Sequence, residues 1–344
     1  MKKTVCLILV FLLSCSLSGC KKESEKFTDY SFDYFDTATS IIGYEADEEI
    51  FKENCDRIKE KLGEYHSLYT AYSRYNDLNN IYSVNNSRDS LEVDERITEM
   101  LEFAVSMHKK TNGYINVAMG SVLSIWHDYR ENGLNNPEDA KLPDMNSLTQ
   151  ANMHTDINDL IIKGNTVFLR DSEMSLDVGA VAKGYATEQI ALWMEEEGMT
   201  GYLLNVGGNI RTVGQRPDGE KWQIGLENPD RESSQAYIEY LEIDEMSIVT
   251  SGSYQRFYTV DGVNYHHIID KDTLMPAVGY KMVSVISKSS AVGDALSTAL
   301  FCMEYDEGRE LVESFEDTYV MWVTEKGEKL YSKGFEKFIK ILEN

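Results

Sequence analysis

An aspartate and a lysine lie close together where an apolar segment leads into a predicted helix. The segment covers residues 175–186, with Asp177 near its apolar end and Lys183 near the helix start. Backbone N–H groups at a helix start attract phosphate, and a lysine there adds a positive charge. The segment therefore predicts a diphosphate site, although close packing of a helix on a sheet beside an exposed lysine explains the same spacing.

A carboxylate and a hydroxyl lie four residues apart in a second predicted helix, at Asp294 and Thr298. Ser289 and Ser290 precede them as candidate caps of this helix. Residues at this spacing share one helix face. Mg²⁺ takes such oxygen ligands while it keeps waters and phosphate oxygens in its other positions. The pair is common by chance, so it indicates a metal site only together with other signals.

Two adjacent histidines, His266 and His267, are followed by Asp270. Histidines beside an aspartate are typical of transition-metal sites. Neighbouring residues of a strand point to opposite faces, so at most one of these histidines is expected to face a site. One packed and one half-exposed histidine is the alternative interpretation.

Hydrophobic spacing predicts the elements that position these residues. Helices are expected at residues 47–69, 94–110, 181–197 and 291–303, and strands at 32–44, 174–178, 202–206, 222–226, 236–241, 247–250, 265–269 and 282–287. Asp94 is the expected N-cap of the second helix, and Cys55 lies on the apolar face of the first. The sequence contains no internal repeat and no Pro-rich linker. This mixture predicts an α+β fold.

The first twenty residues are typical of a lipoprotein signal. Lys2 and Lys3 precede an apolar run at residues 5–13, and Leu17-Ser18-Gly19 leads to Cys20. We expect a signal peptide at residues 1–19, a lipidated tether at 20–30 that starts with acylated Cys20, and one domain at 31–344. This places the protein at the cell membrane, lipid-anchored on the extracytoplasmic face. A plain secretory signal with a coincidental cysteine is the alternative.

The composition narrows the function classes. A formal net charge of −25 over 344 residues counts against nucleic-acid binding and against membrane contact beyond a lipid anchor. With the signal removed and Cys20 acylated, only Cys55 and Cys302 remain as thiols, so no disulfide framework or thiolate zinc site is expected. An anionic ligand would need local neutralisation by a cation, a lysine or helix N–H groups.

Eight short blocks occur in the order seen in ApbE-type FAD:protein FMN transferases, between Phe35 and about Trp322. They are Phe35-Asp36-Thr37 and residues 70–73, 113–118, 176–186, 205–210, 251–256, 267–270 and 294–298. Each block is weak by itself, but their shared order is specific. The chain therefore resembles this family over nearly the whole region after the signal, which implies an ApbE-like mixed sheet with packed helices.

The resemblance implies roles for particular residues. It places the flavin nucleotide against Phe35, Tyr72, Asn116, Val117, Ala118, Asp177, Lys183 and Ile268. It places Mg²⁺ at the backbone oxygen of Ala180 and at Asp294 and Thr298, with Ser297 beside them. Our candidate for the catalytic base is His267, with Asp177 and Asp270 as alternatives. The chain departs from the family pattern at Ile115-Asn116, where Phe-Asp is common, and at Lys271 and Leu274, which replace a proline and a glycine.

The implied activity is magnesium-dependent transfer of FMN from FAD to a threonine or serine hydroxyl of an acceptor protein, with release of AMP. The implied acceptors carry FMN-binding domains, as in subunits of redox pumps and exported reductases. Two alternatives stay open on the sequence: an FAD pyrophosphatase that gives FMN and AMP, and a non-catalytic FAD-binding lipoprotein.

Overall fold

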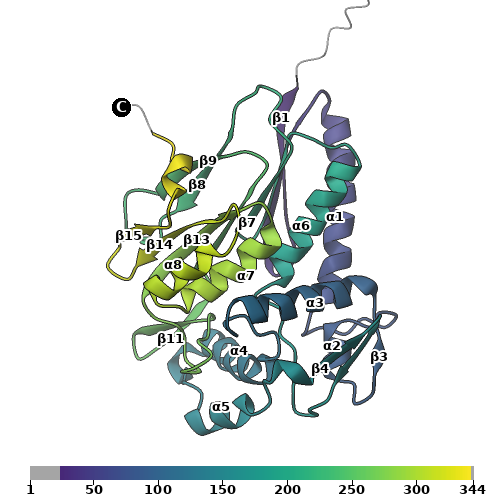
Figure 1. Cartoon of the computed structure of the whole chain (residues 1–344), viewed down its shortest axis with the longest axis vertical. Coiled ribbons are helices and arrows are strands. Elements are labelled where there is room, and N and C mark those ends of the chain that lie inside the picture. The colour runs from purple at the N-terminus through teal and green to yellow at the C-terminus, as the bar shows by residue number, and fades with distance from the viewer. Residues whose placement is uncertain (1–23, 342–344) are drawn as a thin grey trace, which may run out of the picture.

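A computed structural model describes residues 24–341 of the chain, and an eight-stranded antiparallel sheet forms its frame (Figure 1). The strand order is β1-β2-β6-β7-β10-β13-β14-β15. These strands are β1 (Glu25–Tyr34), β2 (Thr37–Glu45), β6 (Tyr202–Val206), β7 (Asn209–Val213), β10 (Ser247–Gly252), β13 (Tyr280–Ser287), β14 (Tyr319–Thr324) and β15 (Lys329–Tyr331). The order places β7 and β10, which flank the candidate site, in the middle of the sheet.

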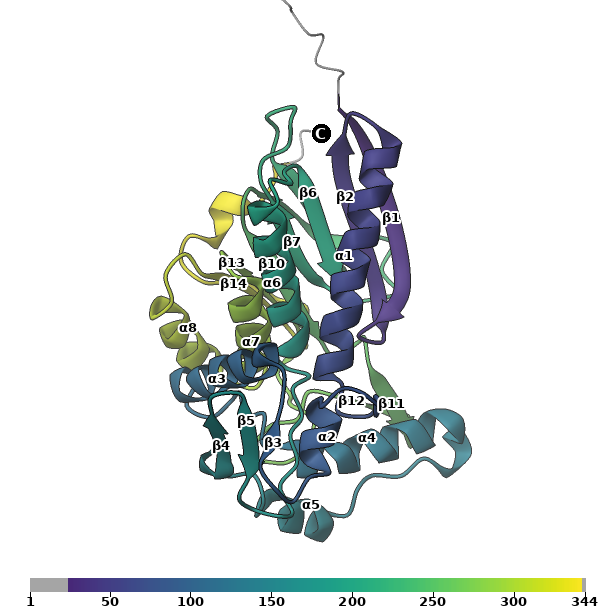
Figure 2. The same cartoon turned by 90° about the vertical axis from the view of Figure 1, so that its right-hand side faces the viewer.

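Helices cover one face of this sheet and bury the main core, as the two views show (Figures 1 and 2). They are α1 (Glu48–Tyr69), α6 (Ala182–Glu196), α7 (Ser290–Phe301) and α8 (Tyr305–Glu313), and α3 (Glu95–Lys110) packs against α1 and α6. The hairpin of β8 (Trp222–Glu227) and β9 (Tyr237–Ile243), with the 3-10 turn Phe335–Phe338, covers the other face through a second apolar cluster. The central strands are therefore buried on both faces, whereas Tyr30 and Phe32 of the edge strand β1 are exposed.

Smaller elements lie at one end of the large sheet (Figure 2). They are α2 (Ile81–Asn85), α4 (Gly120–Asn135), α5 (Met145–Asn152), the sheet of β3 (Leu91–Glu92), β5 (Thr166–Leu169) and β4 (Leu160–Lys163), the hairpin of β11 (Phe257–Val260) and β12 (Val263–His266), and the 3-10 turns Pro137–Asp139 and Ile157–Asp159. A third apolar cluster around Trp126 and Tyr258 joins α4 to β11.

The helix caps confirm the local sequence signals. The Asp47 side chain accepts the Glu49 N–H at the start of α1, and the Asp94 side chain accepts the Arg96 N–H at the start of α3. The Ser289 side chain caps α7 in the same way. Cys55 is fully buried on the inner face of α1, so the prediction that it belongs to the core is confirmed.

Two of the predicted strands differ from the structure, one because a turn divides it and one because it joins no sheet. Residues 32–44 form parts of β1 and β2, because Phe35 and Asp36 take φ values of 53° and 50° and turn the chain back. Residues 174–178 are extended and alternately buried, but their N–H groups do not bond a neighbouring strand. The Leu176 N–H donates to the Asn85 side chain at the end of α2, and the Asp177 N–H donates to the Val117 carbonyl. No ladder forms there.

Two boundaries also differ from the prediction. The strand expected at residues 265–269 is β12, which ends at His266. The His267 N–H still bonds the Arg256 carbonyl at 3.1 Å in the register of the β11–β12 hairpin, but the paired strand does not extend to residues 268 and 269. Strand β1 begins at Glu25, so it includes residues that we expected in the tether. Cys20 and the signal lie outside the described residues. Within residues 24–341, no helix is both long and apolar enough to cross a membrane.

Candidate active site

A cavity of about 370 Å³ opens where the end of the large sheet meets α4 and the β11–β12 hairpin. Its wall combines the segment around Asp177, the first turns of α6 and α7, the middle of α4, and the residues after β10 and β12. Segments that are far apart in the sequence thus meet around one hollow. A cavity of this kind suits a small-molecule ligand.

Asp177 is fixed on three sides at the rim of this cavity. One carboxylate oxygen accepts the Gly179 N–H at 2.8 Å, and the other accepts the Tyr72 hydroxyl at 2.9 Å. The Asp177 N–H donates to the Val117 carbonyl at 2.8 Å. The Tyr72 ring in turn stacks on His127 of α4, with centroids 4.4 Å apart. These contacts fix the orientation of the Asp177 carboxylate at the rim of the cavity.

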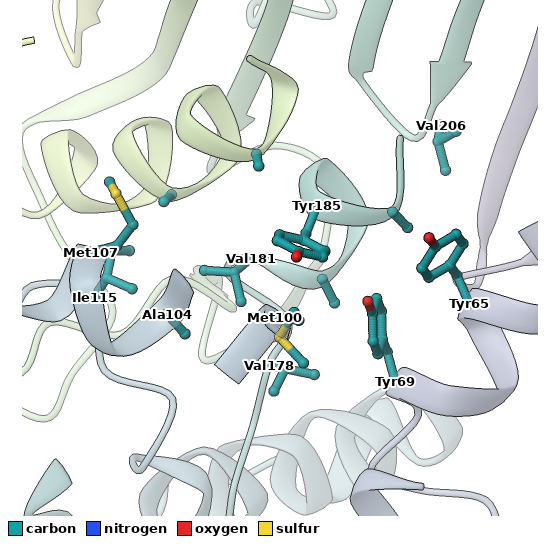
Figure 3. Close-up of a cluster of buried hydrophobic side chains, with 14 of the residues drawn as sticks. Tyr65, Tyr69, Met100, Ala104, Met107, Ile115, Val178, Val181, Tyr185 and Val206 are labelled. Carbon is teal, nitrogen blue, oxygen red and sulfur yellow. The ribbon is translucent and has the colours of Figure 1, made fainter. Parts of the chain in front are cut away.

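An apolar cluster supports the junction that leads from Asp177 into α6. Val178, Val181 and Tyr185 point into the core, where Figure 3 shows them between the tyrosines of α1 and the methionines of α3. The rings of Tyr185 and Tyr69 meet edge to face with their centroids 6.4 Å apart, and Met100 is fully buried nearby. Because the apolar side chains point inward, Ala180 and Lys183 are left to line the cavity.

Asp294 is the most deeply buried carboxylate at the cavity, with 4% of the residue exposed. Its Oδ2 accepts the Gly184 N–H at 2.7 Å, and its Oδ1 lies 3.7 Å from Lys183 Nζ. Burial raises the pKa of Asp294, while Lys183 opposes the rise. Thr298 also lines the cavity, one turn further along α7. A carboxylate, a hydroxyl and the Ala180 segment thus adjoin the same hollow.

The two histidines have different environments. His266 is buried, and both ring nitrogens bond backbone groups, at Ala277 and Ile268. His267 can be reached from the cavity, and its Nδ1 lies 3.2 Å from the Arg256 carbonyl. Since a carbonyl only accepts, Nδ1 carries the hydrogen and Nε2 is the acceptor. Desolvation by the surrounding protein, and then the positive charge of Arg256, lower the pKa of His267 to about 3. The ring is therefore neutral near pH 7.

Positive charge gathers at the cavity although the chain is strongly acidic. Lys183, Arg130 and Arg256 all line it. Arg256 Nη2 donates to the carbonyls of Asp36 at 2.8 Å and Phe35 at 3.3 Å. Burial and the neighbouring Arg130 lower the pKa of Arg256. An anionic ligand here would relieve the repulsion between these cations. This local positive charge explains how a strongly acidic chain can bind an anionic ligand.

The structure brings most of the predicted site residues together. Those that line the cavity are Tyr72, Asn116, Asp177, Ala180, Lys183, His267, Ile268, Asp294 and Thr298. Asn116 also shapes the turn before α4, since its side chain accepts the Ala118 N–H and donates to the Thr155 carbonyl. Asp270, an alternative base, binds the N–H groups of its own turn and is not among the lining residues.

Four predicted residues do not line the cavity. Val117 and Ala118 are buried in the main core. Phe35 lies behind the rim, where its N–H donates to His66 Nδ1 and its carbonyl accepts from Arg256. Ser297 is fully buried behind Ser251, with 2.8 Å between the hydroxyls. These four can act on a ligand only through the neighbours that they hold.

The sequence analysis missed several lining residues. Arg256 lay in a recognised block but received no role, and Asn209 followed a glycine pair that was interpreted only as a turn. His127 and Arg130 lie on α4, a helix that was not predicted. The sequence signal that could have indicated His127 and Arg130 is that each follows an aromatic residue, Trp126 or Tyr129, in a strongly acidic chain.

A buried carboxylate beside a lysine, with further cations on the wall of one large cavity, is typical of an enzyme site that takes an anionic ligand. A model of the ApbE family matches residues 34–322, and the chain belongs to this family. An FAD:protein FMN transferase from Vibrio cholerae is 28% identical over 337 residues, which is 94% of this chain and 96% of that protein. One from Treponema pallidum is 28% identical over 267 residues, or 73% and 72% of the two chains.

Solved structures confirm the predicted α+β, ApbE-like fold. The crystal structure of an ApbE protein from Thermotoga maritima superposes with a TM-score of 0.78 at 26% identity, covering 92% of this chain and 100% of that chain. The flavin transferase ApbE from Vibrio cholerae gives a TM-score of 0.75 at 26% identity, covering 92% and 99%. The similarity includes the elements that build the cavity, because it extends over nearly all of this chain.

Proposed function

We propose that this chain is a magnesium-dependent FAD:protein FMN transferase that attaches the FMN half of FAD to a hydroxyl of an acceptor protein and releases AMP. The observation that carries the proposal is the cavity in which Lys183 and two arginines adjoin the buried Asp294. FAD contributes a diphosphate that matches these cations. Family membership and the names of the relatives support the same reaction.

The donor chemistry around Asp294 fits Mg²⁺. Asp294, Thr298 and Ala180 line the same cavity. Asp294 has a carboxylate, Thr298 has a hydroxyl, and the family resemblance assigns the backbone carbonyl of Ala180 to the metal, so all three groups are oxygen donors. Burial raises the pKa of Asp294, and a bound cation would favour its charged form. Within the described part of the chain, no group of three or more His, Cys, Asp and Glu side chains could hold a metal. Magnesium suits a site with few protein ligands, since it retains waters and phosphate oxygens.

The chain's own residues would orient the diphosphate and remove a proton. When bound, Mg²⁺ supplies charge neutralisation for the phosphates. The Lys183 ammonium group would hold the same phosphates. The N–H groups of Ala182 and Gly184 at the start of α6 already have partners within the protein, so they are not available for this role. The acceptor hydroxyl forms a bond to the FMN-side phosphorus, the bond from that phosphorus to the AMP oxygen breaks, and the hydroxyl proton passes to Nε2 of His267.

The low pKa of His267 is compatible with this role. A neutral ring can accept a proton, but a pKa of about 3 makes a weak base at neutral pH. Arg256 and Lys183 contribute to the low value. Binding of an anionic diphosphate beside these cations would offset the part of the lowering that their charges cause, while the larger part, which comes from desolvation of the ring, would remain.

Mass spectrometry of an acceptor domain tests the proposed reaction. The protein lacking residues 1–19 is mixed with FAD, Mg²⁺ and a small FMN-binding domain. A mass gain equal to FMN minus one water, lost on addition of EDTA, supports both the transferase and its metal. FMN and AMP without an adduct would indicate the pyrophosphatase, and FAD bound unchanged would indicate a non-catalytic carrier.

We further propose that Cys20 is acylated and holds the enzyme on the extracytoplasmic face of the cell membrane, near acceptors with exported FMN-binding domains. The signal-like residues before Cys20 support this proposal. Labelling with a radioactive fatty acid tests it. Cys20→Ala should abolish the label and release the enzyme from membranes, and persistent labelling would overturn the proposed site.

A further inference from the structure

A buried ion pair lies beside the active site without lining the cavity. Glu188 of α6 and Arg211 of β7 are 7% and 6% exposed, and Arg211 Nε lies 3.4 Å from Glu188 Oε2. Arg211 also contacts Glu195 at 3.2 Å and the Thr212 carbonyl. Burying charges is costly, and apolar side chains of similar volume often give equal or greater stability. This pair therefore calls for a reason beyond stability.

The same carboxylate holds the start of the helix that carries Asp294. Glu188 Oε2 accepts the N–H of Ser290, the first residue of α7, at 2.6 Å. The first N–H groups of a helix have no partner within the helix, and a negative charge there is favoured by the helix dipole. Glu188 thus fixes both the position of α7 and its distance from α6.

The contacts between α6 and α7 form two reciprocal bonds. Gly184 and Glu188 lie one turn apart on α6, and Ser290 and Asp294 lie one turn apart on α7. Asp294 of α7 accepts the Gly184 N–H of α6 at 2.7 Å, and Glu188 of α6 accepts the Ser290 N–H of α7. Each helix therefore offers a carboxylate to a backbone N–H of the other.

We propose that Glu188 and Arg211 are positioning residues for the metal site. Glu188 sets the register of α7 against α6, so that Asp294 and Thr298 face Ala180 and Lys183 across the cavity. Arg211 balances the Glu188 charge and ties the pair to β7 in the central sheet. This inference rests on the proposed function, because it concerns the metal that the transferase uses.

Metal binding in two variants tests the inference directly. Glu188→Gln removes the charge but keeps an oxygen for the Ser290 N–H, and Glu188→Leu removes both. Binding of Mn²⁺ as a magnesium substitute is measured by electron paramagnetic resonance with saturating FAD. Changes in groups that orient metal ligands commonly weaken binding about 10- to 100-fold, so we expect about 10-fold for Gln and up to about 100-fold for Leu.

Glu239→Gln provides the matched control. Glu239 of β9 is also largely buried, with 16% of its side chain exposed, and pairs with Lys329 of β15 at 3.0 Å. Unlike Glu188, it makes its hydrogen bonds to β15 and not to the start of α7. Its loss should leave the Mn²⁺ dissociation constant unchanged. Melting temperatures of all variants are measured, with binding assayed well below each. A purely structural role would lower the melting temperature of Glu188→Gln without changing metal affinity.

The outcomes separate the inference from the proposed function. Unchanged Mn²⁺ affinity in a folded Glu188→Gln protein, while the unsubstituted protein binds Mn²⁺ with FAD, would overturn the positioning role and leave the function standing. If the unsubstituted protein binds no Mn²⁺ with FAD, the proposed metal site fails, and the inference with it. Should Glu188→Leu fail to fold, Glu188→Gln alone decides.

Discussion

Replacing Gly184 by alanine tests how closely α6 and α7 must approach. A Cβ at this position would lie 2.3 Å from the Asp294 Cβ and 2.5 Å from the Ser290 carbonyl oxygen, whereas ordinary contacts begin at 3.4 Å. Both neighbours are fixed by the path of α7, so neither can rotate away. The helices must therefore separate locally by about 1 Å, and the Gly184–Asp294 hydrogen bond must lengthen.

The expected effects on stability and on activity differ in size. Overpacking of this kind costs about 1–3 kcal/mol, while alanine in place of a helical glycine returns about 1 kcal/mol. The free energy of unfolding should therefore fall by at most about 2 kcal/mol. A misplacement of about 1 Å at a catalytic site lowers the rate on the order of 100-fold. Activity should suffer far more than stability.

The assay measures FMN transfer to the acceptor at saturating FAD and Mg²⁺, and urea unfolding measures stability. Gly63→Ala in α1 is the control, because a Cβ there would lie 3.5 Å from the Tyr34 ring, an ordinary contact. It should keep full activity and equal or greater stability. A Gly184→Ala enzyme with unchanged turnover and magnesium requirement would refute the reasoning.

Three further substitutions probe the cavity itself. Asp294→Asn should abolish magnesium-dependent transfer, and a magnesium titration that matches the unsubstituted enzyme would contradict the proposed metal site. His267→Ala should lower turnover by ~10²–10⁴-fold and leave FAD binding intact, as a titration of flavin fluorescence can show. Folding lowers the pKa of His267 from 6.5 to about 3, so between these pH values the unfolded chain binds a proton that the folded chain does not. The stability that His267 contributes above pH 6.5 is therefore lost as the pH falls toward 3. Urea unfolding between pH 7 and pH 4 should show a shallower loss in His267→Ala. Arg256→Gln should weaken FAD binding about 10-fold or more, because hydrogen bonds to charged groups contribute about 1.5–3 kcal/mol; equal affinity would remove Arg256 from the phosphate contacts.

The parts of the fold that the sequence predicted are those with local signals. Asp94 and Ser289 mark helix starts by type alone, and the spacing of Asp294 and Thr298 fixes that they share a face. The identity of their partner across the cavity depends on how α6 meets α7. That approach relies on Gly184, which carries no side chain, and spacing within either helix does not reveal it. Only the family resemblance grouped Ala180 with Asp294 and Thr298.

Helix α4 shows why other lining residues were missed. Its N-cap is Met119, which makes no side-chain hydrogen bond, so the helix has no local start signal. The turn before it depends on Asn116 and on the Thr155 carbonyl, 39 residues further along the chain. His127 and Arg130 reach the cavity only because the cluster around Trp126 packs α4 against β11. Tertiary contacts, not helix propensity, therefore placed these two side chains.

The electrostatics of the site depend on the fold in the same way. A net charge of −25 argues against an anionic ligand when it is averaged over the chain. Folding concentrates Lys183, Arg130 and Arg256 from three distant segments at one cavity, close enough for Arg130 to lower the pKa of Arg256. The repulsion between these cations is a cost that the folded chain carries, and an anionic diphosphate would remove it. The affinity for such a ligand should thus arise from the arrangement of a few cations, while the acidic remainder of the surface keeps other polyanions away.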